Sequence, residues 1–164
     1  MTIKIRPAAI ADRAALLRIL DNTPEFKPFE VVVAVEVIDC FLQDNSNSGY
    51  LILIAEDNTD ITGYICYGPT PLTDGTWDIY WEAVAREKRG QGIGSTLMEA
   101  AEQKIRKARG RLALIETSST PAYETTRLFY LGQGYEIIAR IPDFYSPGDD
   151  KLVLQKRLKG NRLL

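Results

Sequence analysis

The sequence predicts a mixed α/β sheet with helices on both faces. Seven segments carry the apolar patterns of strands, and four segments repeat apolar residues at helical spacing. The two later helices each lie between strands, as in the crossovers that join parallel strands. Of the 164 residues, 45% are apolar and 26% charged, so we expect one globular domain over residues 1–164.

The N-terminal half is predicted in this order: strand 2–6, helix 8–20, loop 21–29, helix 30–42, strand 50–57 and strand 60–68. Apolar alternation indicates the strands, and Asn58-Thr59 supplies the turn between the last two. Two prolines break the helical pattern within the loop. The fourth segment contains a β-branched run that suits a strand, but its polar residues recur at spacings of three and four, so we predict a helix.

The C-terminal half is predicted in this order: loop 69–75, strand 76–84, helix 92–108, strand 112–116, helix 120–131, strand 135–141, loop 142–150 and strand 151–158. The first of these helices has one apolar stripe, a cationic last turn and Gly110 as its stop. Thr120-Pro121 suits the N-cap and first position of the second helix, which Gly134 closes.

Composition excludes several classes of function. The net charge of −2 gives no reason to expect a nucleic-acid partner. The chain has no histidine, and Cys40 and Cys66 are too few and too far apart for a metal site, so we expect no metal. Reduced thiols and an N-terminus without the apolar core of a signal peptide indicate the cytoplasm. The longest apolar run, Tyr50 to Ala55, is too short to span a membrane.

The glycine-rich segment 89–95 is the strongest functional signal. It reads Arg89-Gly90-Gln91-Gly92-Ile93-Gly94-Ser95, follows a basic run and opens the helix predicted at 92–108. Bare backbone amides at the positive end of a helix are suited to binding phosphate.

Three kinds of phosphate site are compatible with glycines in front of a helix. A P-loop requires a Lys and a Ser or Thr after its last glycine, whereas Gly94 is followed by Ser95-Thr96. A dinucleotide fingerprint fits Gly90 and Gly92, with Glu116 near the position of a ribose-binding acid. Its third glycine is replaced by Ser95, however, and a charged run separates strand from loop, so this alternative is weaker.

The third kind of site rests on a resemblance. The strand 78–84, a short charged loop and Arg89-x-x-Gly92-x-Gly94 resemble the central motif of the GNAT superfamily of N-acetyltransferases. The segment from Glu116 through residues 129–135 is similar to the superfamily's C-terminal motif, and the order of elements is similar throughout. The resemblance implies a mostly antiparallel sheet of about seven strands, with a central parallel pair that splays apart and helices on both faces.

The resemblance also implies how acetyl-CoA would bind. The main chain of Glu82, Ala83 and Val84 would pair with the pantetheine amides like an added strand. Backbone amides of the glycine-rich segment, which would form a cradle, would hold the pyrophosphate, with Arg89 among its basic neighbours. The expected cradle residues are Gly90, Gln91, Gly92, Ile93, Gly94 and Ser95.

Acetyl transfer to an amine requires a base, stabilisation of the oxyanion and a proton for the leaving thiolate. By resemblance, Tyr130 would donate that proton, because it lies four residues before Gly134. Glu116 ends a strand at the cleft and would be the base; Asp78 is its rival. Alternation places Asp78, Tyr80 and Glu82 on one face of their strand.

Two loops are expected to flank the acceptor. They supply Phe26 and Phe29 from 22–29, and Phe144 and Tyr145 from 142–150, beside carboxylates that suit a cationic amine. Many protein-acetylating relatives carry an Asn where this chain has Tyr123, which leaves the acceptor open.

The sequence is therefore interpreted as an acetyl-CoA-dependent N-acetyltransferase acting by direct transfer to a primary amine, on a small molecule or a protein. Its partners would be acetyl-CoA and an amine, without nucleic acid or membrane; the family resemblance also implies a homodimer as one arrangement of the chain. A non-catalytic acyl-CoA-binding domain and a dinucleotide-dependent oxidoreductase are the alternatives.

Overall fold

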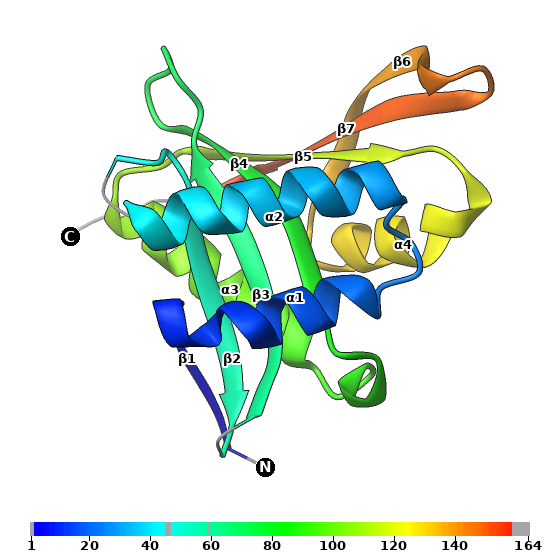
Figure 1. The fold of residues 1–164 in the computed structure, drawn as a ribbon. Coiled ribbons are helices and arrows are strands. Elements are labelled where there is room, and N and C mark those ends of the chain that lie inside the picture. Colours follow the sequence, from blue (N-terminus) through cyan, green and yellow to red (C-terminus); the bar gives the residue numbers. More distant parts are fainter. Residues whose placement is uncertain (1, 45–46, 59, 159–164) are drawn as a thin grey trace.

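A seven-stranded sheet with the order β1-β2-β3-β4-β5-β7-β6 organises the computed structural model, which describes residues 2–44, 47–58 and 60–158 (Figure 1). The strands are β1 (Ile3–Pro7), β2 (Leu51–Asp57), β3 (Asp60–Pro69), β4 (Thr76–Val84), β5 (Leu112–Ser118), β6 (Glu136–Ser146) and β7 (Asp149–Arg157). The helices are α1 (Arg13–Asp21), α2 (Pro28–Gln43), α3 (Ile93–Lys107) and α4 (Glu124–Gly132). The short 3₁₀ turns are η1 (Ile10–Asp12), η2 (Arg86–Lys88) and η3 (Pro121–Tyr123).

The parallel pair β4–β5 lies at the centre of an otherwise antiparallel sheet. The two strands pair only where Thr76, Trp77 and Asp78 meet Leu112, Ala113 and Leu114. Both strands continue beyond this pairing, and Figure 1 shows them diverging. This confirms the mixed, mostly antiparallel sheet with a splayed central pair.

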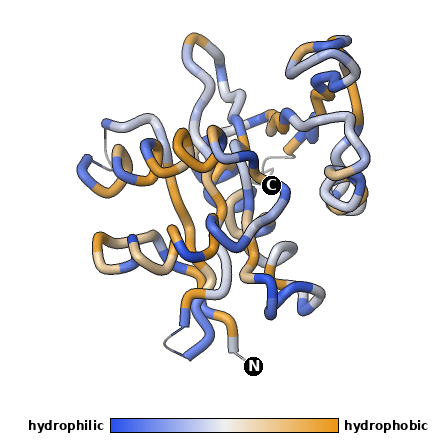
Figure 2. The backbone as a smooth tube through the Cα atoms, turned by 45° about the vertical axis from the view of Figure 1, so that its right-hand side comes forward, coloured by the Kyte–Doolittle hydropathy of each residue, from blue (hydrophilic) through white to orange (hydrophobic). Residues whose placement is uncertain are grey.

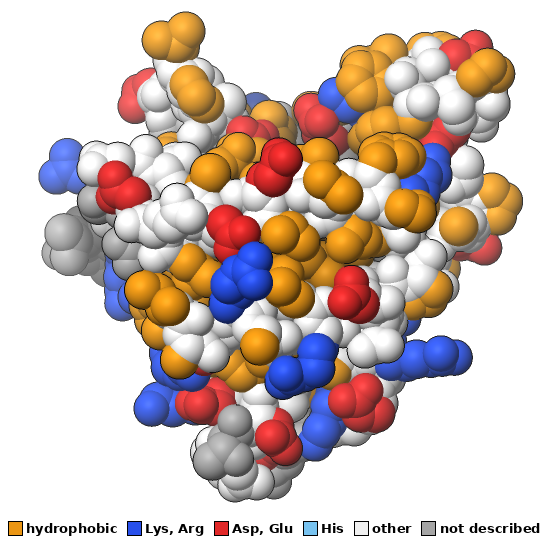
Figure 3. Space-filling view, viewed as in Figure 1, with side chains coloured by type: hydrophobic (Ala, Val, Ile, Leu, Met, Phe, Trp, Pro, Cys, Tyr) orange, Lys and Arg blue, Asp and Glu red, His pale blue; other side chains and the backbone are white. Residues whose placement is uncertain are grey.

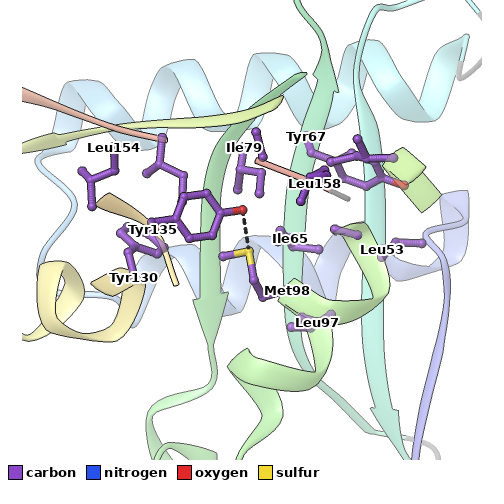
Figure 4. Close-up of a cluster of buried hydrophobic side chains, with 14 of the residues drawn as sticks. Leu53, Ile65, Tyr67, Ile79, Leu97, Met98, Tyr130, Tyr135, Leu154 and Leu158 are labelled. Carbon is purple, nitrogen blue, oxygen red and sulfur yellow. Dashed lines mark hydrogen bonds between the residues drawn. The ribbon is translucent and has the colours of Figure 1, made fainter. Parts of the chain in front are cut away.

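Two hydrophobic clusters fix helices to the two faces of the sheet. One packs α1 and α2 on β2 and β3, through residues such as Leu16, Ile38 and Tyr64. The other packs α3 and α4 on the opposite face, and Figure 4 shows Tyr130 and Tyr135 in it, with the Tyr135 hydroxyl directed at Met98. Figure 2 shows the accompanying pattern, with hydrophobic backbone through the central strands and mixed polarity along the outer helices.

The predicted helices are confirmed, with altered starts. The ambiguous segment 30–42 is helical as predicted, but α2 begins earlier, at Pro28, where a proline lacks only an N–H that the helix does not use. Pro121 opens η3 before α4, and Gly134 has a φ of 89° after it. The turn predicted at Asn58-Thr59 cannot be traced whole, because Thr59 lies outside the described residues.

The loop predicted at 142–150 is wrong. Strand β6 runs to Ser146 and β7 starts at Asp149, so the two strands form a long hairpin that projects from the body of the molecule (Figure 1). Prolines in this segment suggest a loop. However, β6 is an edge strand, and on its open side a proline without an N–H loses no hydrogen bond between strands. A register shift between Ile141 and Ser146 accommodates the irregular residues.

A bulge in β4 overturns the prediction that Asp78, Tyr80 and Glu82 share a face. Opposite β3, Trp81 pairs with Cys66 and Ile79 pairs with Tyr67, which leaves Tyr80 as an extra residue. The alternation therefore reverses at Tyr80. Glu82 faces the α3 side with its partner Ile65, whereas Asp78 points to the opposite side from its core neighbour Ile79.

Candidate active site

A cavity of about 830 Å³ lies where β4 and β5 separate. The predicted site residues that line it are Phe26, Phe29, Asp78, Glu82, Ala83, Val84, Arg89, Gly90, Gly92, Ile93, Gly94, Ser95, Glu116, Tyr130 and Tyr145. Gln91 and Phe144 are the two predicted site residues outside this lining. Segments far apart in sequence therefore meet at one cleft.

The second half of β4 offers a free backbone edge to this cavity. Its pairing with β3 continues to Val84, whereas its pairing with β5 stops at Asp78. The backbone groups on the β5 side of residues 82–84 are thus available to an extended ligand, which could add to the strand by main-chain hydrogen bonds.

The glycine loop presents an open helix end. Gly90 and Gly92 have φ values of 75° and 80°, which favour glycine, and a Cβ at either position would meet empty space. Gly92 is the N-cap of α3, and no side chain caps the helix there. The first-turn amides of α3 and its positive end are therefore free to bind an anion.

The basic residues beside the loop are partly engaged with the protein. Lys88 Nζ lies 3.2 Å from Asp57 Oδ2, and Arg89 Nη1 lies 3.0 Å from Glu25 Oε1. Arg89 also donates to the Val84 carbonyl oxygen at 3.3 Å. Burial is the largest single effect on the pKa of Glu25 and raises it, but the hydrogen bonds from Arg89, a backbone hydrogen bond and the charges of Arg89 and Arg86 together hold that pKa below its usual value. Arg89 thus links the glycine loop to the α1–α2 loop.

Tyr130 carries the buried hydroxyl that is predicted to donate a proton to the leaving thiolate. It is 6% exposed, lines the cavity from α4 and packs beside Phe129 and Tyr135. Burial is the main cause that raises the pKa of Tyr130 above its usual value. The hydroxyl is consequently protonated throughout the neutral range and carries a proton that can be donated.

The two candidate bases occupy different surroundings in the same cavity. Glu116 lies two residues before the end of β5, its side chain is 53% exposed, and its Oε2 accepts from Lys151 Nζ at 2.8 Å. Asp78 is partly buried and accepts a hydrogen bond from Thr70 Oγ1 at 2.6 Å. Both carboxylates can reach a ligand in the cavity, and neither is sealed in the core.

The end of the cavity opposite the glycine loop combines carboxylates with aromatic rings. Tyr145 lies there among Glu116, Asp149 and Glu30; burial first, and then these charges, raise its pKa to about 12. Asp149 is buried, accepts from Ser118 Oγ and lies 3.7 Å from Lys27 Nζ. Phe26 and Phe29 line the same cavity from the α1–α2 loop and the first turn of α2.

Phe144 lies outside this pocket. Its ring stands beneath the Lys151 ammonium at 3.8 Å and edge-on to Tyr145 at 5.0 Å. The ring contact places Phe144 beside Tyr145 rather than on the opposite face of β6, but only Tyr145 of the two lines the cavity. The prediction for Phe144 assumed that residues 142–150 form a loop, whereas β6 continues to Ser146.

Two side chains of the cavity were missed or undervalued by sequence reasoning. Tyr123 donates its hydroxyl hydrogen to the Glu25 carbonyl oxygen at 2.9 Å and thereby joins η3 to the α1–α2 loop. Glu82 lines the cavity, and its carboxyl lies against the start of α3, although only its main chain was expected at the site. The signal for Glu82 was a charge inside a largely apolar strand, but the bulge that directs it is not visible in the sequence.

Two kinds of feature are absent from the part of the chain that the structure describes. No group of three or more Cys, Asp or Glu side chains there could hold a metal ion. No helix within residues 2–44, 47–58 and 60–158 is long and apolar enough to cross a membrane.

Comparisons with known proteins agree with this geometry. The model of the acetyltransferase (GNAT) domain matches residues 48–137, more than half of the chain. A structure assigned to the GNAT family of acetyltransferases, from Desulfovibrio desulfuricans, is 35% identical, with a TM-score of 0.93. The alignment covers 96% of this chain and 100% of that one. The protein therefore belongs to the GNAT family of acetyltransferases.

More distant structures share the fold. Ribosomal-protein-alanine N-acetyltransferase from Brucella melitensis is 26% identical with a TM-score of 0.76, over 94% of this chain and 99% of that one. PaiA N-acetyltransferase from Thermoplasma acidophilum, solved with coenzyme A, is 17% identical with a TM-score of 0.75, over 96% and 99% of the two chains. No curated protein sequence matches the chain.

Proposed function

We propose that the protein is an acetyl-CoA-dependent N-acetyltransferase that moves the acetyl group directly to a primary amine. The observation that carries the proposal is the continuous cavity from the uncapped N-terminus of α3 to Tyr130, along the unpaired edge of β4. A phosphate site alone would not require this long backbone edge or a buried hydroxyl.

The chain's own groups fit this donor at three places. Amides of residues 90–95 at the start of α3 suit the pyrophosphate, and the open space at Gly90 and Gly92 leaves room for it. The free edge of residues 82–84 suits the pantetheine amides. At the third place, Arg89, a carboxylate is already bound, so a phosphate at this guanidinium would compete with Glu25.

The transfer itself requires proton movement at two atoms. A carboxylate, Glu116 or Asp78, takes a proton from the ammonium so that the amine nitrogen can attack the thioester carbonyl. The Tyr130 hydroxyl then donates its proton to the departing sulfur. Neither cysteine supports a covalent acetyl-enzyme, because Cys66 is buried with a raised pKa and Cys40 does not line the cavity.

The acceptor is a cationic amine. Glu30, Glu116 and Asp149 surround Tyr145 at the acceptor end. Lys27 lies against Asp149, and Lys151 lies against Glu116. Aromatic rings of Phe26 and Phe29 provide additional attraction for an ammonium group. A protein N-terminus, a lysine or a small amine each satisfies this chemistry.

The proposal is tested by thiol release. The protein is mixed with acetyl-CoA and a panel of peptides, polyamines, amino acids and aminoglycosides, and free thiol and the mass of each amine are measured. We expect one acetyl group on the amine for each thiol released. Binding of acetyl-CoA without turnover across the panel would favour the non-catalytic alternative, and preferential stabilisation by NAD or NADP would favour the dinucleotide alternative.

A further inference from the structure

Glu82 is a buried carboxyl group that the fold leaves without a partner. Its Oε2 atom is inaccessible to solvent and has no hydrogen-bond partner among the described residues. The β4 bulge turns this side chain toward α3, and its Oε1 lies only 2.5 Å from where a Cβ on Gly94 would be. Gly94 therefore leaves the space that the carboxyl occupies.

The surroundings of Glu82 favour its neutral form. Neighbouring elements present Ile65 from β3, Gly94 from α3, and Phe129 and Tyr130 from α4. Of these, only Tyr130 titrates, and it is neutral at physiological pH. The charged cavity residues Asp78, Lys88, Arg89 and Glu116 do not add to the effect of burial, which raises the pKa of Glu82 well above its usual value.

The start of α3 acts in the opposite direction, because a helix N-terminus favours a carboxylate. No helix amide donates to Oε2, however, so burial dominates. In its protonated form this carboxyl offers one O–H donor and one free acceptor, on a residue that lines the donor cavity and lies against Gly94 of the phosphate loop. Burying such a group without a partner lowers stability, which indicates a role with ligand bound.

A protonated carboxyl is complementary to an amide. Its O–H can donate to an amide carbonyl, and its other oxygen can accept from an amide N–H. The pantetheine arm of acetyl-CoA carries two amides and a hydroxyl, and it is the part of the donor expected beside residues 82–84.

We propose that Glu82 is a donor-binding residue whose protonated carboxyl hydrogen-bonds the pantetheine arm of acetyl-CoA. This inference rests on the proposed function. It assigns a role to the side chain that is separate from the strand-like pairing of the β4 main chain. It also makes donor binding sensitive to pH, because an ionised Glu82 has no proton to donate and would be left charged beneath the bound arm.

The test is calorimetric titration of acetyl-CoA, without acceptor, between pH 6 and pH 9. The wild type is compared with Glu82→Gln, which is neutral at every pH, with Glu82→Leu, which has no polar atom, and with the exposed control Glu136→Gln. We expect wild type and Glu82→Gln to bind equally at pH 6 and to diverge as pH rises, the wild type weakening. Ionisation of the ligand affects both proteins alike and cancels in the ratio of their affinities.

Glu82→Leu separates a ligand role from a folding role. It should bind acetyl-CoA about tenfold more weakly at every pH, since one buried hydrogen bond is lost. Its melting temperature without ligand should be at least that of the wild type, because an unpaired carboxyl has been replaced by an apolar group. A lower melting temperature with unchanged affinity would overturn the inference.

The inference is also overturned if wild type and Glu82→Gln show the same pH profile while both bind acetyl-CoA. Loss of turnover in Glu82→Gln at an unchanged pH profile of binding would show a proton-transfer role in its place. A wild type that binds no acetyl-CoA at any pH would overturn the proposed function itself, which distinguishes the two failures.

Discussion

The two ends of the cavity are lined by different kinds of chemical group, backbone amides and carbonyls at one end and side chains at the other. At the donor end, the expected contacts are backbone groups: the open edge of β4 and the uncapped amides after Gly92. At the acceptor end, side chains line the wall, including Phe29, Glu116 and Tyr145. Figure 3 shows hydrophobic side chains gathered along α2 and on the β6–β7 hairpin, which flank that end.

This difference explains why the donor is easier to infer than the acceptor. A backbone site needs glycines and a helix start at fixed spacing, so it leaves a pattern in the sequence. A side-chain site depends on loops and a hairpin brought together by the fold, and many residue choices can form it. The donor end therefore supports a definite ligand, and the acceptor end supports only a class, the cationic amines.

The sequence predicted most of the fold for the same reason. Periodic apolar patterns located the strands, and the glycine segment located the start of α3 within one residue. Phe144 was misplaced because a proline-rich edge strand resembles a loop. The shared face predicted for Asp78, Tyr80 and Glu82 was wrong because a bulge adds one residue to β4 opposite β3, and this bulge depends on a contact distant in sequence.

The largest effect is expected where the two ends meet, at Tyr130. Replacing Tyr130 with Phe removes the proton for the leaving sulfur, so kcat should fall by about 10³-fold while acetyl-CoA affinity stays within about twofold. Steady-state kinetics and calorimetry measure the two quantities. Tyr50→Phe, a tyrosine outside the cavity lining, is the matched control. Full turnover in Tyr130→Phe would remove this hydroxyl from the mechanism.

The next effect distinguishes the two carboxylates at the acceptor side. We expect Glu116→Gln to lower kcat/KM by about 10²-fold for an amine acceptor, as loss of a general base does, and Asp78→Asn to cost less. The reversed order would assign the base to Asp78. Acetyl-CoA affinity should be unchanged in both variants, because neither carboxylate is expected to contact the donor.

A smaller effect tests the backbone site directly. Gly92→Ala places a side chain on a residue with a φ of 80°, which costs about 1–2 kcal/mol of stability, and fills the open space at the helix end. Acetyl-CoA should bind about tenfold more weakly, with acceptor KM unaffected. Gly132→Ala, at the open end of α4, is the matched control and should leave donor affinity unchanged. Equal affinity in both variants would argue against a phosphate cradle at Gly92.

The smallest effect concerns the stability of the protein without ligand. Because the pKa of Glu82 is raised in the folded state, its contribution is fully present below the pKa of an unfolded glutamate and is lost as pH rises through the folded value. Glu82→Gln should abolish this loss, so its melting temperature should exceed that of the wild type by about 2–4 °C at alkaline pH. Parallel melting profiles for the two proteins across pH would show that the pKa of Glu82 does not differ between the folded and unfolded states.

The central claim is that backbone amides of β4 and of the glycine loop hold the donor, and amide hydrogen exchange tests it most directly. Exchange is followed by mass spectrometry with and without saturating acetyl-CoA. We predict slower exchange in two separate segments, residues 82–84 and residues 90–95, with little change in the β6–β7 hairpin. Saturating acetyl-CoA that leaves both segments unprotected, or protects only segments remote from the cavity, would contradict the account.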